Sequence, residues 1–257
     1  MSDCRAPGVW MWFVLFCGMG CAETEGLGLD GGWVDAGSAD GGVTVDAGPI
    51  DVVRLRGNLA TTNEQAVMTT PLPGATVCQT FPIEGPCAIS EANGAYELEV
   101  VADAEVLLEV GAPEVPNYLL PLRTGAVAGN LNVPLLPLGV IAGWGTLTGG
   151  TLDPRRGILI VQVAAPDVTV TLSPDDARVR AYTDAAGGVP NPGLPRSSPH
   201  GFAIFLDVPP GEHTVRVEHP TRSCRRGLGW AGAAENFARG PIRAGQVTRL
   251  TVACRAQ

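Results

Sequence analysis

Few residues in this sequence have the type and spacing that catalysis requires. His213 and His219 fall on one face of a predicted strand, but six strand residues separate them by about 20 Å, too far to share a metal ion. Asp175 and Asp176 are adjacent carboxylates, yet the preceding Pro174 favours a simple turn. No G-x-S-x-G, Walker A or G-x-G-x-x-G sequence flanks a strand-to-helix turn. We therefore expect no catalytic residues, no metal and no cofactor, and predict that the protein is not an enzyme.

Four aromatic residues in or beside predicted loops indicate a different chemistry, the binding of sugars. They are Trp144, Tyr182, Trp230 and Phe237. Exposed flat rings stack on sugar faces, whereas large aromatic rings more often close the end of a hydrophobic core. Carbohydrate binding by these rings is therefore our alternative prediction for the function, and core packing is the simpler interpretation.

Arginines gather toward the C-terminal end and form a candidate anion-binding group. Its members are Arg222, Arg225, Arg226, Arg239, Arg243 and Arg249. Guanidinium groups bind phosphate and carboxylate in bidentate geometry. Lipopolysaccharide, an acidic polymer or the acidic first half of this chain are the partners we consider, and a plain solvated surface is the alternative. We take Arg225 and Arg226 as the candidate ligand-binding residues.

The first 20 residues have the features of a leader for export. The apolar run Val9–Cys17 is far too short to cross a bilayer, which takes about 20 residues. Small residues then precede Cys21, so the segment resembles a bacterial lipobox, which implies cleavage before Cys21 and its lipidation. Gly18 stands where a lipobox usually has Leu, so ordinary secretion with a free Cys21 is the alternative. Ala22 favours an outer-membrane lipoprotein, on its periplasmic or cell-surface side.

The remaining cysteines indicate disulfides. Cys4 and Cys17 leave with the predicted leader, and four cysteines follow Cys21. An even number in an exported protein favours disulfides, for which three pairings exist. We favour Cys78–Cys87 and Cys224–Cys254, because each closes within one predicted domain. A zinc site is the alternative, but the sequence contains no C-x-x-C.

Charge and composition divide the rest of the chain. Residues 22–50 carry six acidic residues and no basic one and are rich in Gly, Asp and Ala, so residues 21–50 are predicted to be the lipidated cysteine and a disordered tether. Residues 51–136 carry ten acidic residues and three Arg, and residues 137–257 carry nine acidic residues and thirteen Arg. An acidic front and a basic back argue against nucleic-acid binding. No lysine is present.

Alternating apolar residues predict strands throughout 51–136. Tyr96, Leu98 and Val100 alternate with glutamates, and Asn93-Gly94 before them predicts a type I′ hairpin turn. The sequences PLPGATV (71–77) and NGAYELEV (93–100) resemble the carboxypeptidase regulatory-like domain, which implies a transthyretin-like (prealbumin-like) β-sandwich. The peptidase activity in that family's name is not implied, because none of the three histidines stands in H-x-x-E.

Residues 137–156 are a predicted linker in which 139–144 forms a short helix or a strand. The sequence GFAIFLDVPPGEHTVRV (201–217) resembles a hairpin of the same superfamily, which implies a second, divergent β-sandwich over 157–257. The predicted fold class is therefore all-β, with two tandem transthyretin-like sandwiches after a signal peptide and a disordered tether.

We expect a membrane-anchored lipoprotein of the cell envelope that displays two sandwiches as a binding or structural module. Its expected partners are the membrane, through the lipid anchor, and envelope polysaccharide or protein, with no nucleic acid. A carbohydrate-binding accessory protein of the cell surface is the alternative.

Overall fold

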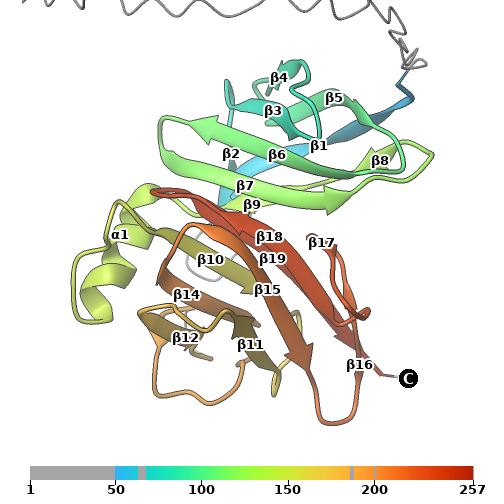
Figure 1. Ribbon diagram of the computed structural model, residues 1–257. Helices are drawn as coiled ribbons and strands as arrows, with labels where there is room; N and C mark the ends of the chain where they lie inside the picture. The colour runs from blue at the N-terminus through green and yellow to red at the C-terminus, as the bar shows by residue number, and fades with distance from the viewer. Residues whose placement is uncertain (1–49, 63–67, 186–187, 200, 257) are drawn as a thin grey trace, which may run out of the picture. The chain divides into compact units, whose positions relative to one another are not determined.

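Strands dominate this chain because short alternating apolar runs are interrupted at frequent intervals by Gly and Pro. The computed structural model describes residues 50–62, 68–185, 188–199 and 201–256 (Figure 1). The predicted signal peptide, Cys21 and the acidic segment up to residue 49 lie outside the described residues, as does His200. The described residues belong to one compact unit.

The first sandwich is built from the N-terminal half of the described chain. One layer is a five-stranded sheet in which β1 is central, and β8 and β9 run parallel to it. Its strands are β1 (Val52–Thr62), β2 (Met68–Pro71), β5 (Ala95–Val101), β8 (Gly129–Asn130) and β9 (Val133–Leu135). The opposite layer consists of β3 (Thr76–Phe81), β4 (Cys87–Ile89), β6 (Glu105–Ala112) and β7 (Val115–Arg123).

The second sandwich follows the helix α1 (Leu138–Leu147). One layer contains β10 (Gly157–Gln162), β12 (Val179–Thr183), β13 (Pro190–Asn191), β14 (Phe202–Val208), β16 (Ser223–Arg226) and β19 (Val247–Arg255). The opposite layer is a four-stranded sheet of β11 (Thr169–Ser173), β15 (Gly211–Glu218), β17 (Trp230–Ala231) and β18 (Phe237–Ile242). The all-β prediction of two tandem sandwiches is confirmed.

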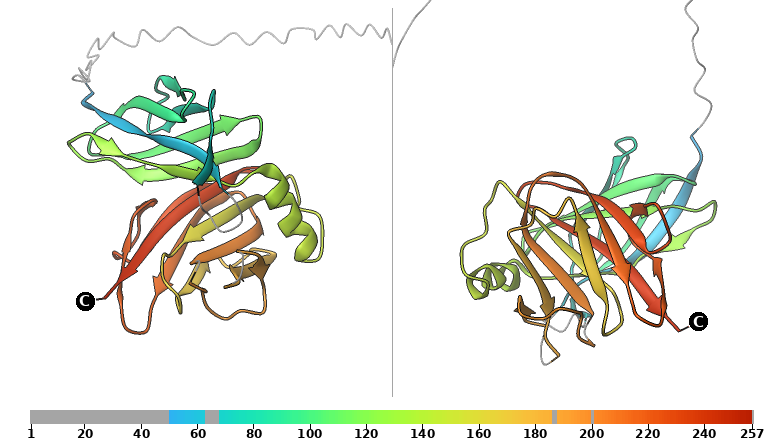
Figure 2. Two further views of the ribbon diagram at one scale, coloured as in Figure 1. Left: turned by 180° about the vertical axis from the view of Figure 1, so that it is seen from behind. Right: turned by 60° about the horizontal axis from the view of Figure 1, so that its bottom comes forward.

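A single ten-stranded sheet runs through both sandwiches. Its order is β13-β12-β14-β10-β19-β7-β6-β3-β4, with β16 on β19. The junction is the parallel pair β7–β19, where Val247 lies opposite Tyr118 and Thr248 opposite Leu119. The two strands meet where β19 begins and then diverge (Figure 1), and Figure 2 shows the two sandwiches from two further directions. The two halves are therefore joined by backbone pairing.

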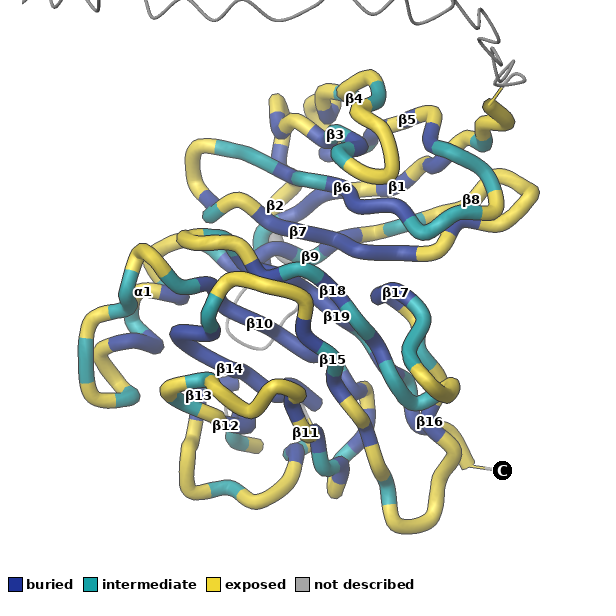
Figure 3. The backbone as a smooth tube through the Cα atoms, viewed as in Figure 1, coloured by how far each residue is buried: buried dark blue, intermediate teal, exposed yellow. Residues whose placement is uncertain are grey.

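The hydrophobic core follows the same continuity. One cluster combines residues of the first half, such as Leu108 and Tyr118, with Ile158, Ile160 and Ile204 of the second. A second cluster fills the interior of the second sandwich. Strands β7 and β10, near the junction, are buried along most of their length (Figure 3). Burial of apolar surface is the main favourable term in folding, so the halves share part of their stability.

The segment predicted as a linker contains α1. The helix begins after Pro137. Proline suits the start of a helix, because its φ is fixed near the helical value and because an N–H at this position would have no acceptor within the helix. Ile141 and Trp144 are buried in the shared core cluster. The strand before the helix is short, since β9 ends at Leu135 and Leu138 already belongs to the helix. Of the two alternatives for 139–144, the helix is correct.

The predicted hairpin at Asn93-Gly94 is wrong. Strand β5 pairs with β1 and β4 pairs with β3, so the turn links two layers. Only Gly94 has positive φ (+80°), whereas a type I′ turn requires it at both positions. A Cβ at Gly94 would lie 2.2 Å from the Leu59 carbonyl oxygen. Gly94 therefore lets the turn approach β1 more closely than a residue with a side chain would allow.

The segment Pro209-Pro210-Gly211 is likewise not a hairpin turn. Strand β14 pairs with β10 and β12, whereas β15 pairs with β11 and β18. The two prolines lack N–H donors and cannot continue the ladder, so the chain crosses there to the other layer. The buried Asp207 carboxylate supports this corner by accepting from the Asp153 backbone N–H (2.8 Å) and the Arg178 side chain (2.5 Å).

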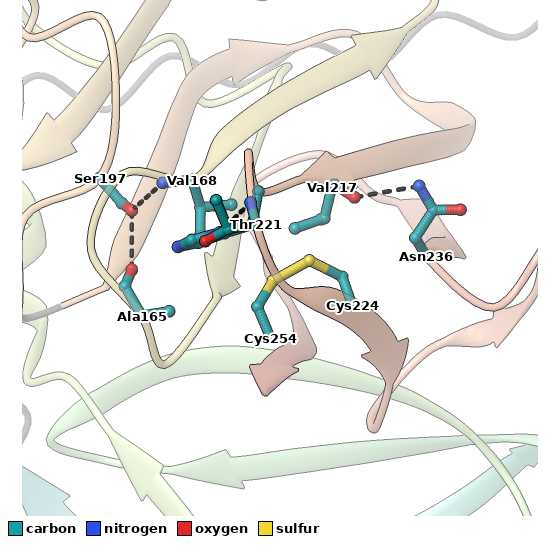
Figure 4. Close-up of a disulfide and its surroundings, with 9 residues drawn as sticks. Ala165, Val168, Ser197, Val217, Thr221, Cys224, Asn236 and Cys254 are labelled. Carbon is teal, nitrogen blue, oxygen red and sulfur yellow. Dashed lines mark hydrogen bonds between the residues drawn. A yellow bond between two sulfur atoms is a disulfide. The ribbon is translucent and has the colours of Figure 1, made fainter. Parts of the chain in front are cut away.

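Both disulfides are present in the predicted pairing, and each joins two neighbouring antiparallel strands. Cys78 lies directly opposite Cys87 on β3 and β4, and Cys224 opposite Cys254 on β16 and β19. The second disulfide is buried at the end of the second core, and hydrogen bonds of nearby loops surround it (Figure 4). It fixes β16 to the strand that makes the junction.

All three tyrosines of the chain are buried and bonded to the backbone. The Tyr96 hydroxyl donates to the Leu131 carbonyl (2.8 Å), and the Tyr118 hydroxyl accepts from the Leu136 N–H (2.9 Å). The Tyr182 hydroxyl accepts from a backbone N–H in the second sandwich. Burial raises the pKa of each tyrosine above its ordinary value of 10.0.

We predict that removal of the second disulfide destabilises the protein more than removal of the first. The loops closed span 30 and 9 residues. Chain entropy then gives losses of about 4 kcal/mol for Cys224→Ala/Cys254→Ala and about 3 kcal/mol for Cys78→Ala/Cys87→Ala. Guanidinium unfolding under non-oxidising conditions measures both. A larger loss for the Cys78/Cys87 pair would contradict the prediction.

We also predict that stability falls as the pH rises above 10. Unfolded tyrosines ionise near pH 10, whereas the raised pKa of each folded tyrosine keeps its proton on, so this contribution is lost as the pH climbs toward the folded pKa. Arg249 opposes the trend, because burial lowers its pKa to about 10, but it is one group against three. Tyrosinate absorbance should appear together with loss of the β-sheet circular dichroism. Ionisation near pH 10 in a folded protein would refute it.

Candidate functional site

The aromatic residues predicted to bind sugar do not form an exposed platform. Trp144, Tyr182 and Trp230 are only 4%, 2% and 8% exposed, and the half-buried Phe237 ring lies under the Arg216 guanidinium. The Tyr182 hydroxyl accepts a hydrogen bond from the Val170 backbone N–H (2.8 Å). Trp144, Tyr182 and Trp230 fill core space, as large aromatic side chains usually do. The four rings therefore offer no shared exposed surface, and carbohydrate binding by them stays a prediction.

Trp230 joins the two halves of the unit. Its indole N–H donates to the Val106 carbonyl on β6 (2.9 Å), and its ring packs with Leu107 and Leu119 in a small separate cluster. The ring centroid also lies 5.3 Å from that of Phe81. A residue predicted to bind ligand thus holds β17 against the first sandwich.

Charged contacts follow the same boundary. Arg239 pairs with Glu105 (3.3 Å), and Arg243 pairs with Glu109 (3.1 Å), to which Gln246 also donates (3.1 Å). The acidic first half of the chain is one of the partners that we consider for the arginine group, and both ion pairs join an arginine of that group to a glutamate of the first half. Both glutamates lie on β6, which β7 connects to the junction.

Arg225 and Arg226, the candidate ligand-binding residues, lie on β16. With Arg255 they line a depression of about 530 Å³ on the surface. Arg225 pairs with Glu235 (3.1 Å), but both side chains are more than 70% exposed, so this pair contributes little to stability. Anion binding at this depression stays a prediction.

His213 has a structural environment. It is 3% exposed, and its Nε2 lies 3.1 Å from the Asp176 carboxylate. His219 instead accepts from the Thr221 backbone N–H (3.0 Å). Within the ranges that the structure describes, no group of three or more His, Cys, Asp or Glu side chains is arranged to hold a metal ion.

A crevice of about 450 Å³ contains one arginine of the predicted group, and we call it the Arg249 crevice. Its walls come from β1, from the segment that follows β7, and from strands β9, β10 and β19. The lining mixes polar and aliphatic side chains, and Val53, Leu55, Val100, Leu122, Val133 and Leu228 are among the aliphatic ones. Volumes of about 300–1,000 Å³ are typical of small-molecule sites.

Arg249 is the buried charge of this crevice. The residue is 4% exposed in the middle of β19. Its guanidinium donates to the Pro134 carbonyl and to the Gln162 side-chain oxygen (2.9 Å), both of them neutral acceptors. Burial lowers its pKa to about 10, so the group still carries its charge at neutral pH.

Other polar groups of the crevice are committed to the fold. The Thr124 hydroxyl donates to the Val101 carbonyl (2.6 Å) and accepts from the Ala104 N–H (3.0 Å), and the Thr251 hydroxyl accepts from the Leu228 N–H (2.6 Å). Arg54 and Arg123 are exposed members of the lining. The arrangement offers a cation in an apolar surround and has neither a nucleophile nor a general base.

Sequence reasoning placed Arg249 in the arginine group but did not single it out. The available signal was its position between Val247 and Leu250, inside a stretch of Val, Leu and Thr that favours a strand. Among the described residues, no helix has the length and apolar content of a membrane span.

Comparisons with known proteins find distant similarities to solved structures only. No family model and no curated protein matches the chain. Among solved structures, it is similar to the Bacillus anthracis TIE protein (12% identity, TM-score 0.25), covering 79% of this chain and 34% of that chain. It is similar to GBS52, the minor pilin of Streptococcus agalactiae, with 8% identity and a TM-score of 0.27, covering 79% of this chain and 96% of that chain. A DUF3823 family protein from Parabacteroides merdae is also similar, with 12% identity and a TM-score of 0.25, covering 76% of this chain and 98% of that chain.

This chain thus spans about a third of the TIE protein. At such identities and TM-scores, the likeness carries no argument about the function of this chain.

We predict that Trp230→Ala lowers the free energy of unfolding by about 3–5 kcal/mol, because it empties a packed site and leaves the Val106 carbonyl without its donor. Trp230→Phe should cost less, since a ring remains. Phe237→Ala, which removes a half-buried ring, is the control. Urea unfolding followed by circular dichroism measures all three. A loss below about 1 kcal/mol for Trp230→Ala would show that the indole does not hold the halves together.

Proposed function

We propose that the protein is a membrane-anchored, non-catalytic lipoprotein of the cell envelope. It displays its pair of β-sandwiches as one rigid binding or structural module, held by a lipid on Cys21 and a tether over residues 22–50. The proposal covers location and mode of action together. Its location is the outer membrane, on the periplasmic or cell-surface side.

The observation that carries the display role is the continuous sheet. The strands β7 and β19 pair directly, and the core cluster spans both halves, which supports display of the two sandwiches as one body. A rigid body presents a surface at a fixed geometry, which lowers the entropy cost of binding. Two disulfides add resistance to unfolding outside the cytoplasm.

The non-catalytic role rests on the chemistry of the crevice. An arginine cannot act as a general base at neutral pH, because its side chain keeps its proton. The hydroxyls of Thr124 and Thr251 already bond to backbone groups. The crevice therefore supports binding.

We predict that the mature protein begins at a lipidated Cys21. The full chain, produced in a bacterium that processes lipoproteins, should take up an alkyne-labelled fatty acid, and its N-terminal peptide should carry diacylglycerol by mass spectrometry. Cys21→Ser should abolish both signals, because the thiol is the attachment point.

Cys17→Ser is the matched control, since it changes a cysteine of the same leader without touching the attachment point. Its labelling should equal that of the wild type. A mature N-terminus with a free thiol, or label that persists in Cys21→Ser, would overturn the anchor.

A further inference from the structure

Arg249 is a buried cation without a carboxylate beside it. Its two acceptors among the described residues, the carbonyl of Pro134 and the side chain of Gln162, are neutral, whereas a guanidinium has five N–H donors. A buried charge is costly unless an opposite charge compensates it. The lowered pKa of Arg249 expresses that cost.

Two other arginines of the unit pair with a carboxylate, whereas the half-buried Arg156 and Arg226 donate to backbone carbonyls and are partly open to solvent. Arg178 pairs with Asp207 (2.5 Å), and Arg239 pairs with Glu105 (3.3 Å). The lining of the Arg249 crevice, by contrast, contains three arginines and no Asp or Glu. In a chain of net charge −9, an acid-free cavity around a buried cation is complementary to an anion.

The walls set the second property of a ligand. Val53 and Leu131 of the lining are half-buried and Val127 is exposed, so apolar side chains of the crevice are open to water. Apolar surface of this kind gains free energy when a hydrocarbon displaces water from it. A ligand should therefore join an anionic head to an apolar body.

The number of buried cations sets the third property. One guanidinium lies in the interior, whereas Arg54 and Arg123 are exposed, and Arg54 already pairs with Glu97 (3.1 Å). A single negative charge is then compensated, and the second charge of a phosphate monoester would not be. A planar carboxylate also matches the fork of a guanidinium.

We propose that the Arg249 crevice binds a small amphiphilic monocarboxylate, whose head pairs with Arg249 and whose aliphatic chain lies along the apolar wall. This inference goes beyond the display role and holds whether or not Cys21 is lipidated. The crevice thus becomes a specific acceptor for a soluble fatty-acid-like molecule.

The test is isothermal titration calorimetry of the full chain at pH 7.5 and low salt with three probes. Decanoate carries both features, decanol has only the chain, and acetate has only the charge. Decanoate should bind one to one and at least tenfold more tightly than decanol, with acetate weaker still. The preference over decanol should shrink as salt is added.

Two sets of variants locate the binding. Arg249→Gln should lose at least tenfold in decanoate affinity and lose the preference over decanol, and Arg249→Lys should retain part of both. The exposed Val127, at the rim of the crevice and 76% exposed, provides a pair that leaves the interior intact. Val127→Glu should weaken decanoate binding several-fold by charge repulsion, whereas the isosteric Val127→Gln should not.

The Val127 pair decides the result if Arg249→Gln does not fold. Equal affinity for decanoate and decanol, or no binding of either, would overturn the proposal. Unchanged decanoate binding by a folded Arg249→Gln variant would also overturn it, as would equal effects of Val127→Glu and Val127→Gln. None of these outcomes bears on the lipid at Cys21, so the two proposals fail separately.

Discussion

The parallel pairing of β7 with β19 is the constraint on which the rest of this unit depends. Unpaired, each strand would present a row of free backbone groups at a sheet edge, which invites association with other chains. Paired, they carry one sheet through both sandwiches and bring β6 within reach of Trp230, Arg239 and Arg243. The Arg249 crevice is a product of the same joint, because its lining comes from both halves.

Strand positions were largely predictable, because the pleat gives each strand a period of two that the sequence displays directly. Tyr96, Leu98 and Val100 are buried and the glutamates between them are exposed, as expected. The connections were not predictable in the same way. Gly94 and Gly211 each mark a change of direction, but a local turn signal does not say whether the next strand joins the same layer or the opposite one.

The site was less accessible from sequence than the fold. Residue type alone favoured Trp144, Tyr182 and Trp230 as ligand contacts, but hydrophobic burial decided their positions, and it acts on all large rings alike. Arg249 and Arg225 are equivalent as sequence symbols. They differ because β19 lies in the interior of the sheet, whereas β16 pairs only with the end of β19. The interior position of β19 depends on its pairing with β7, which joins residues more than a hundred positions apart in the sequence.

The place of β19 in the sheet has a consequence for folding. This strand, Val247–Arg255, is central to the second sandwich, carries Cys254 and pairs with β7 of the first. Neither half can therefore reach its finished state without the other. Contacts of such large sequence separation are formed slowly, so incompletely assembled intermediates are expected on the folding pathway.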